Sequence, residues 1–172
     1  MTITVLSRAQ AIRYAYPRLA AIISIRAPHS AKTQIPEHVR RLNVVFSDAV
    51  PTPDGPKMRI HPKHRHIGTE QDYECEVREI ALFMEKHAQA IRTFVEEHFA
   101  VPGSVSTGCD GMVMPLFIHC LGGISRSTAV AQALGEWLDV PVTYNNEVDP
   151  NPHVLKVLRD HLQWGQGLGA AA

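Results

Sequence analysis

One stretch of this chain decides its expected fold: Ile118-His119-Cys120-Leu121-Gly122-Gly123-Ile124-Ser125-Arg126-Ser127-Thr128. An apolar run of strand length, 114–118, leads into it, and a segment rich in Ala and Leu, 129–138, follows it. The alanine and leucine content favours a helix. The pattern therefore predicts a strand, a tight glycine-containing loop and a helix in direct succession.

The predicted loop has the chemistry of an anion-binding site. Backbone N–H groups of such a loop and of the first helical turn point at one position, where the helix dipole adds positive potential. Cys120 and Arg126 enclose the loop with five residues between them, so a thiol and a bidentate phosphate ligand face the same anion. These surroundings favour the thiolate, the nucleophilic form of cysteine. The alternative is a buried cysteine in an ordinary strand-to-helix turn.

These residues resemble the His-Cys-x5-Arg-Ser/Thr motif of cysteine-dependent protein tyrosine phosphatases, and 123–127 is closest to the dual-specificity branch. The resemblance implies an α/β fold with a central, mainly parallel sheet flanked by helices, like that of dual-specificity phosphatases. It implies that Cys120 is the nucleophile and that Arg126 binds phosphate oxygens. Ser127 resembles the hydroxyl that eases departure of the sulfur, and His119 resembles the residue that orders the loop. The implied phosphate-binding residues are Leu121, Gly122, Gly123, Ile124, Ser125 and Arg126.

The resemblance also implies a general acid, an Asp on a loop upstream of the motif. The chain lacks the Trp-Pro-Asp tripeptide of the receptor-type enzymes, and the best match is Asp48, which follows the apolar run 42–46. Its separation from Cys120 is longer than is usual in the dual-specificity branch, and we attribute the difference to an insertion at 49–69. A residue of a surface turn is the plainer interpretation of Asp48. Three further aspartates remain alternatives for the acid: Asp54, Asp72 and Asp110.

Apolar runs of strand length alternate with helical patterns along the rest of the chain. Continuous apolar runs are typical of parallel strands covered on both faces, so the pattern indicates α/β layering. We expect a single domain over 1–164 with a loop insertion at 49–69, followed by a flexible tail at 165–172. The expected strands are 3–6, 19–25, 42–46 and 114–118. The expected helices are 7–16, 72–99, 129–138 and 153–164, and the segment 72–99 is either one long helix or a bent pair.

Composition narrows the class of protein further. A chain of 172 residues with 45% hydrophobic and 20% charged residues suits one soluble globular domain. Lys plus Arg equals Asp plus Glu at 17 each, so no overall field attracts nucleic acid or a membrane. Three cysteines without a Cys-x-x-Cys pair argue against a disulfide scaffold. No signal peptide or membrane span is recognisable, and we expect a cytoplasmic protein.

The insertion at 49–69 is rich in proline and is basic from 57 to 66. It predicts either a positively charged rim that guides phosphorylated substrates or a solvated surface loop. His61, His64 and His66 raise the question of a metal, but no other ligands at a recognisable spacing accompany them. We therefore expect neither a metal nor an organic cofactor.

The expected function is hydrolysis of phosphomonoesters through a phosphocysteine, with a phosphorylated protein as substrate and with dual specificity for phosphotyrosine and phosphoserine or phosphothreonine. One alternative is a phosphatase for a non-protein substrate, such as a phosphoinositide or an RNA 5′-triphosphate. Another is a non-catalytic module that binds phosphate groups. Phosphate, sulfate and vanadate are the expected ligands of the loop, and neither a membrane nor nucleic acid is expected as a partner.

Overall fold

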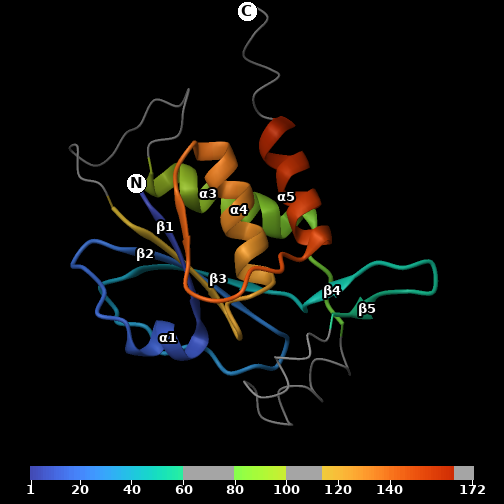
Figure 1. The fold of residues 1–172 in the computed structure, drawn as a ribbon, viewed down its shortest axis with the longest axis horizontal. Coiled ribbons are helices and arrows are strands. Elements are labelled where there is room, and N and C mark those ends of the chain that lie inside the picture. Colours follow the sequence, from blue (N-terminus) through green and yellow to red (C-terminus); the bar gives the residue numbers. More distant parts are fainter. Residues whose placement is uncertain (60–79, 100–113, 165–172) are drawn as a thin grey trace, which may run out of the picture.

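The computed structural model of the chain describes residues 1–59, 80–99 and 114–164. Its centre is a five-stranded sheet flanked by helices, and every neighbouring pair of strands is parallel (Figure 1). The predicted α/β architecture is thus confirmed. The strands of this sheet are β1 (Ile3–Ser7), β2 (Ala21–Arg26), β3 (Arg40–Val45), β6 (Leu116–Cys120) and β7 (Val142–Tyr144), and the helices are α1 (Arg8–Arg13), α3 (Glu85–His98), α4 (Arg126–Leu138) and α5 (Pro152–Trp164).

The strand order β3-β2-β6-β1-β7 makes two connections diverge at the centre of the sheet. From β1 the chain passes through α1 to β2, whereas from β6 it passes through α4 to β7. Right-handed crossovers in opposite directions place their helices on opposite faces. Figure 1 shows α1 below the sheet and α4 above it, together with α3 and α5. Open α/β sheets bind ligands at the carboxyl ends of strands that diverge in this way.

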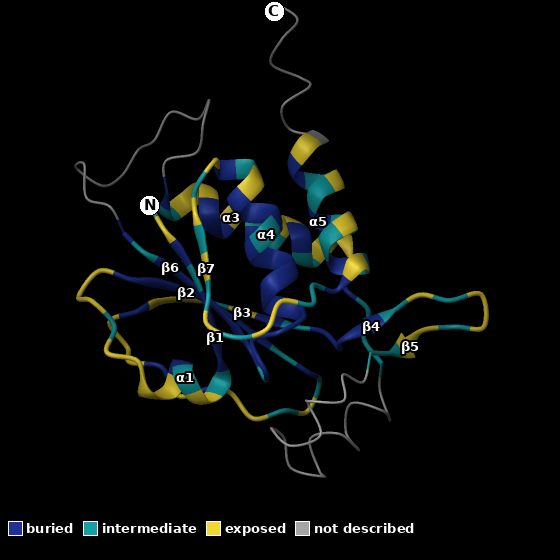
Figure 2. Ribbon diagram, viewed as in Figure 1, coloured by how far each residue is buried: buried dark blue, intermediate teal, exposed yellow. Residues whose placement is uncertain are grey.

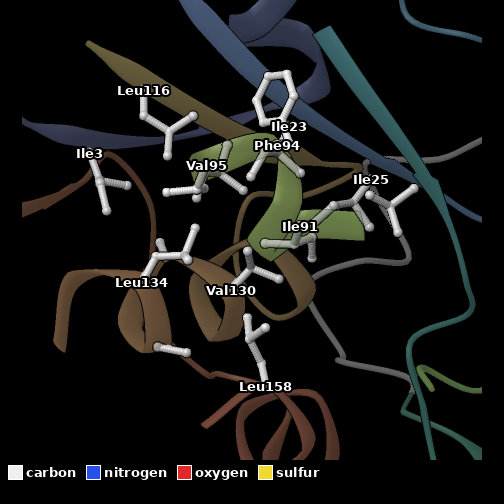
Figure 3. Packing of buried hydrophobic residues seen from close by; sticks show 14 of the residues in the cluster. Ile3, Ile23, Ile25, Ile91, Phe94, Val95, Leu116, Val130, Leu134 and Leu158 are labelled. Carbon is white, nitrogen blue, oxygen red and sulfur yellow. The ribbon is translucent and has the colours of Figure 1, made fainter. Parts of the chain in front are cut away.

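The sheet separates two apolar cores, and alternate side chains of each strand enter one or the other. The larger core lies between the sheet and α3, α4 and α5, and Figure 3 shows Ile23, Leu134 and Leu158 within it. The smaller core, on the α1 side, includes Ile22 and Phe117. Figure 2 shows the central strands buried beneath helices with exposed outer sides. Covering both faces explains why the strands are continuous apolar runs in the sequence.

The prediction of helix at 72–99 is wrong for residues 80–84, because α3 begins only at Glu85. The segment before α3 makes backbone contacts with the end of β3 instead. Ala81 exchanges two hydrogen bonds with Ser47, and the ring of Phe83 packs edge-on against Phe46 at 4.8 Å. These tertiary contacts override the helical pattern of the sequence. Residues 72–79 lie outside the described part of the chain.

Two further segments differ from expectation. The start of the expected loop insertion forms a hairpin of β4 (Ala49–Val50) and β5 (Lys57–Met58), which projects from the side of the domain in Figure 1. Gly55, with a φ of 109°, forms part of its turn. The connection expected after α4 contains the edge strand β7, which pairs with β1. Its short length explains why no strand pattern was visible there.

Several expectations fall on residues outside the described ranges. They concern Asp72, Asp110, His61, His64, His66, the remainder of the insertion at 60–69, and the tail at 165–172. Within the described part of the chain, none of the helices has the length and apolar character that crossing a bilayer requires.

Candidate active site

The predicted strand, loop and helix are present at the centre of the sheet. β6 ends at Cys120 and α4 begins at Arg126, and we call residues 120–126 the cysteine loop. Gly123 turns this loop with a φ of 69°. A Cβ atom at Gly123 would lie 2.7 Å from the backbone nitrogen of Ser7 and 2.8 Å from the carbonyl carbon of Leu6. Glycine therefore allows the loop to fold back over the end of β1.

The sulfur of Cys120 lies inside the cysteine loop, and the residue is only 2% exposed. The backbone N–H of Gly123 donates a hydrogen bond to the sulfur at 3.3 Å. The hydroxyl of Ser127, in the first turn of α4, lies 3.1 Å from the same sulfur. Donors of this kind stabilise negative charge on sulfur. The site thus contains a thiol whose surroundings suit a nucleophile.

Four other backbone N–H groups of the cysteine loop have no hydrogen-bond acceptor among the described residues. Three of these four residues are buried, and a buried donor without an acceptor costs about 1–3 kcal/mol. An anion at the N-terminus of α4 would accept these hydrogen bonds. The four donors belong to Leu121, Gly122, Ile124 and Ser125.

Arg126 is buried beside the cysteine loop, with 3% of its surface exposed. One terminal nitrogen, Nη1, donates a hydrogen bond to the carbonyl oxygen of Phe46 at 2.9 Å. This bond anchors the guanidinium to the end of β3 and fixes the plane of its five-donor fork. The arginine is consequently held in place before any ligand arrives, which reduces the entropy lost on binding.

Asp48 lies against the cysteine loop and is 3% exposed. Its Oδ1 accepts hydrogen bonds from the Ser125 hydroxyl and from Nδ2 of Asn151, each at 2.8 Å. Its Oδ2 has no hydrogen-bond partner among the described residues. Asp48 is therefore part of the buried site rather than an exposed turn, with one carboxyl oxygen uncommitted.

Asn151 joins the last helix to this site. Its Oδ1 accepts hydrogen bonds from the backbone N–H groups of His153 and Val154, as a helix N-cap does. Its Nδ2 reaches Asp48 and the carbonyl oxygen of Ala49. One fully buried amide therefore caps α5 and orients the carboxyl group of Asp48 at the same time.

A second aspartate, Asp149, lies over the cysteine loop but in a different electrostatic setting. Its backbone N–H donates to the carbonyl oxygen of Ile124, and both carboxylate oxygens lie 2.9 Å from Nη2 of Arg59. Nη1 of the same arginine donates to the Ser125 hydroxyl at 2.9 Å. Arg59 and Asp149 thus form an ion pair, in which the Asp149 side chain is 40% exposed.

The remaining aspartate alternatives do not join the site in the described structure. Asp54 lies in the exposed turn of the β4–β5 hairpin, where it is 3.7 Å from the ammonium group of Lys57. Asp72 and Asp110 fall outside the described ranges. Asp48 and Asp149 are thus the aspartates that the described residues bring to the cysteine loop.

His119 lies on the opposite side of β6 from Cys120, towards the α1 side of the sheet, and is 1% exposed. Neither ring nitrogen makes a well-formed hydrogen bond with a described residue. Burial lowers the pKa of His119 to about 4, and the nearby positive charges of Arg8 and Arg126 add to this effect. A contact between the imidazole and the Cys120 backbone, not aligned well enough for a hydrogen bond, raises the pKa and offsets part of this lowering. The imidazole is therefore neutral at physiological pH.

Some residues of the site were not predicted from the sequence. They are Arg59, which belongs to the basic stretch 57–66, and Asn151, which precedes the last expected helix. The Asn-Pro pair at 151–152 is the signal that a cap residue would occupy this position. Nothing in the sequence reveals that its amide also contacts Asp48. Within 1–59, 80–99 and 114–164, no three His, Cys, Asp or Glu side chains gather to hold a metal ion.

Comparisons with known proteins identify no relative. The chain matches no protein-family model, no curated protein and no solved structure.

The close fit of Gly123 gives a direct test of the loop geometry. Gly123→Ala is expected to lower the free energy of unfolding by about 2–3 kcal/mol, because the new methyl group meets the backbone of β1 and the positive φ disfavours alanine. Urea denaturation measures the loss. Gly55→Ala is the matched control, since φ is also positive there but no atom lies within 4 Å. Equal losses in the two variants would contradict the proposed contact.

The buried His119 predicts a dependence of stability on pH. The unfolded chain binds a proton at an ordinary histidine pKa near 6.5, whereas the folded chain binds it near 4. Between these values the unfolded state holds more protons, so stability falls as the pH falls. From pH 7 to pH 5 the wild type should lose about 2 kcal/mol more than His119→Gln.

Urea denaturation of both proteins at the two pH values measures this difference. His38→Gln, which removes an exposed imidazole, controls for the loss of one histidine. If the free energy of unfolding changed equally with pH in the wild type and in His119→Gln, the lowered pKa of His119 in the folded protein would be contradicted.

Proposed function

We propose that this chain is a phosphatase that hydrolyses phosphomonoesters through a phosphocysteine on Cys120. The observation that carries the proposal is the buried sulfur, in contact with the Ser127 hydroxyl, inside a loop in which four N–H groups have no acceptor among the described residues. A phosphate group supplies acceptors for those donors and places its phosphorus next to the sulfur. A site that only binds phosphate and catalyses no reaction would not require a hydroxyl 3.1 Å from that sulfur.

In the first step the thiolate of Cys120 attacks phosphorus. An S–P bond forms while the bond from phosphorus to the leaving oxygen breaks, and the leaving oxygen takes up a proton. The three equatorial oxygens accept hydrogen bonds from the loop N–H groups and from the guanidinium of Arg126. Preorganised donors of this kind typically contribute about 3–4 kcal/mol each to lowering the barrier.

Asp48 is the proposed donor of that proton. Both hydrogen bonds to its carboxyl group use Oδ1, which leaves Oδ2 to carry the proton towards a leaving group. Asp149 suits the role less well, because Nη2 of Arg59 lies 2.9 Å from both of its carboxyl oxygens. Its pairing with Arg59 instead holds that arginine over the Ser125 hydroxyl.

In the second step a water molecule attacks phosphorus and the S–P bond breaks. The departing sulfur becomes a thiolate again, and Asp48 accepts a proton from the water. The hydroxyl of Ser127 and the N–H of Gly123 stabilise the negative charge that returns to the sulfur. The same two donors therefore act in both steps of the reaction.

Two features support a likeness to dual-specificity phosphatases, although fold analogy alone does not define a substrate. The cysteine loop follows a central strand of a parallel sheet, and the proposed acid follows a strand of the same sheet. We propose a phosphorylated protein as a substrate class, with a non-protein phosphoester as the alternative. A non-catalytic phosphate-binding module is less well supported, because binding alone requires no uncommitted carboxyl oxygen beside the loop.

The nucleophile is tested with Cys120→Ser and p-nitrophenyl phosphate. The substitution should lower kcat by at least about 10³-fold, because serine at this position is a much weaker nucleophile. Cys75→Ser and Cys109→Ser make the same change elsewhere in the chain and should retain activity. Thermal unfolding checks that all variants fold. Full activity of Cys120→Ser would exclude the phosphocysteine mechanism.

The acid is tested with Asp48→Asn and Asp149→Asn, the same change at the two aspartates of the site. Asp48→Asn should lower kcat by about 10²-fold or more and remove the basic limb of the pH profile. The loss should be greater for phenyl phosphate than for p-nitrophenyl phosphate, because phenolate is the more basic leaving group. Asp149→Asn should lower kcat less than about tenfold and keep the basic limb. The reverse pattern would transfer the role to Asp149.

A further inference from the structure

A small pocket adjoins the cysteine loop at the carboxyl ends of the central strands. Three arginines line it, each at an end of an element: Arg8 begins α1, Arg26 ends β2 and Arg126 begins α4. Leu121 of the cysteine loop contributes to the wall, and no carboxylate lines the pocket. The divergence of β1 and β6 brings these distant residues together, because their carboxyl ends lie side by side in the sheet.

Two of these arginines, Arg8 and Arg26, form no ion pair with a described residue. Arg8 has no side-chain hydrogen bond or ion pair with any described residue. Arg26 donates from Nη1 to the carbonyl oxygen of Ser30 at 3.0 Å, but its buried Nε has no described partner. Like charges gathered in one pocket repel each other, and an anionic ligand removes this cost.

Two of the pocket's arginines, Arg8 and Arg26, lie outside the cysteine loop, where the phosphate under attack is proposed to bind. Along β6 the side chain of Cys120 belongs to the larger core, on the side of α3, α4 and α5. Arg26 alternates with Ile25, a member of that core, and so projects to the α1 side, where Arg8 begins its helix. Arg126 and Leu121 belong to the cysteine loop and also line the pocket. Two anions bound on either side of the loop would thus be close neighbours.

On the basis of the phosphatase activity proposed above, we propose that Arg8 and Arg26, with Arg126, bind a second phosphoryl group of the substrate next to the one attacked by Cys120. Of the two substrate classes proposed above, this pocket favours the alternative, a non-protein phosphoester, and specifically a small molecule with adjacent phosphates. Arginine suits this task because its planar fork binds phosphate oxygens in pairs. The interior of the pocket, about 10 Å³, is too narrow for a phosphoryl group, so the second phosphate contacts the arginines at its mouth. A phosphomonoester without a neighbouring phosphate fills the cysteine loop but does not reach Arg8 and Arg26.

Adjacent phosphates occur in two chemical forms, either joined by an anhydride bond or carried on neighbouring carbons of a ring. Inorganic tripolyphosphate represents the first form and inositol hexakisphosphate the second. p-Nitrophenyl phosphate, with a single phosphate, is the reference. The wild type should show a kcat/KM at least about tenfold higher for one of the two polyphosphates than for the reference, and the preferred probe identifies the form.

Removal of single arginines tests the pocket itself. Arg8→Gln and Arg26→Gln should each reduce kcat/KM for the preferred polyphosphate about tenfold or more relative to p-nitrophenyl phosphate. Arg13→Gln removes the same charge from the exposed end of α1 and should keep the wild-type ratio. Arg8→Lys, which keeps the charge but not the fork, should lie between Arg8→Gln and the wild type. Ratios equal to that of the wild type in both glutamine variants would overturn the proposal.

Calorimetric binding to Cys120→Ser separates this proposal from the proposed activity, because binding needs no turnover. Tripolyphosphate or inositol hexakisphosphate should bind at least about tenfold more tightly than inorganic phosphate, and Arg8→Gln in the same background should remove the difference. If p-nitrophenyl phosphate is hydrolysed but neither polyphosphate binds more tightly than phosphate, the pocket proposal fails and the activity stands. If binding follows the arginines without any hydrolysis, the activity fails and the pocket stands.

Discussion

The contact between Gly123 and the end of β1 is the constraint on which the rest of the site depends. The cysteine loop can turn tightly only because no side chain separates it from the backbone at Leu6 and Ser7. That turn directs the N–H of Gly123 to the Cys120 sulfur. It also places the first turn of α4 so that the hydroxyl of Ser127 lies 3.1 Å from the same sulfur. The parallel pairing of β1 with β6 therefore does more than stabilise the sheet, because it also shapes the cysteine loop.

Around this loop, two separate segments contact the hydroxyl group of Ser125, and a third segment holds both of them in place. Ser125 donates to Asp48, which follows β3, and accepts from Arg59, which follows β5. Asp149 and Asn151, which precede α5, secure those two partners. A hydrogen-bonded group of this kind holds its members more firmly than isolated pairs do. The geometry of the proposed acid therefore depends on residues far from it in sequence.

The sequence predicted the parts of the fold that local pattern controls. Continuous apolar runs identified β2, β3 and β6, and the Cys-x5-Arg spacing located the cysteine loop. The start of α3 was missed because the hydrogen bonds of Ala81 with Ser47 are tertiary and leave no periodic signal. Arg8 and Arg26 were likewise not predicted as part of a site, because only the order of the strands in the sheet brings them together. Local sequence pattern therefore predicts helices and strands, whereas the order of the strands in the sheet determines which distant residues meet at a site.

The double role of Asn151 has a consequence for how the protein is made. Its partner Asp48 lies 103 positions earlier in the chain, and the amide reaches it only when the first turn of α5 is formed and docked. During synthesis the ribosome releases the end of β3 long before it releases α5. The cysteine loop, which lies between them in the chain, can close on its strand before Asp48 is oriented. The carboxyl group of Asp48 is thus held in its final orientation only after α5 has docked, so the arrangement of the finished site coincides with completion of the fold.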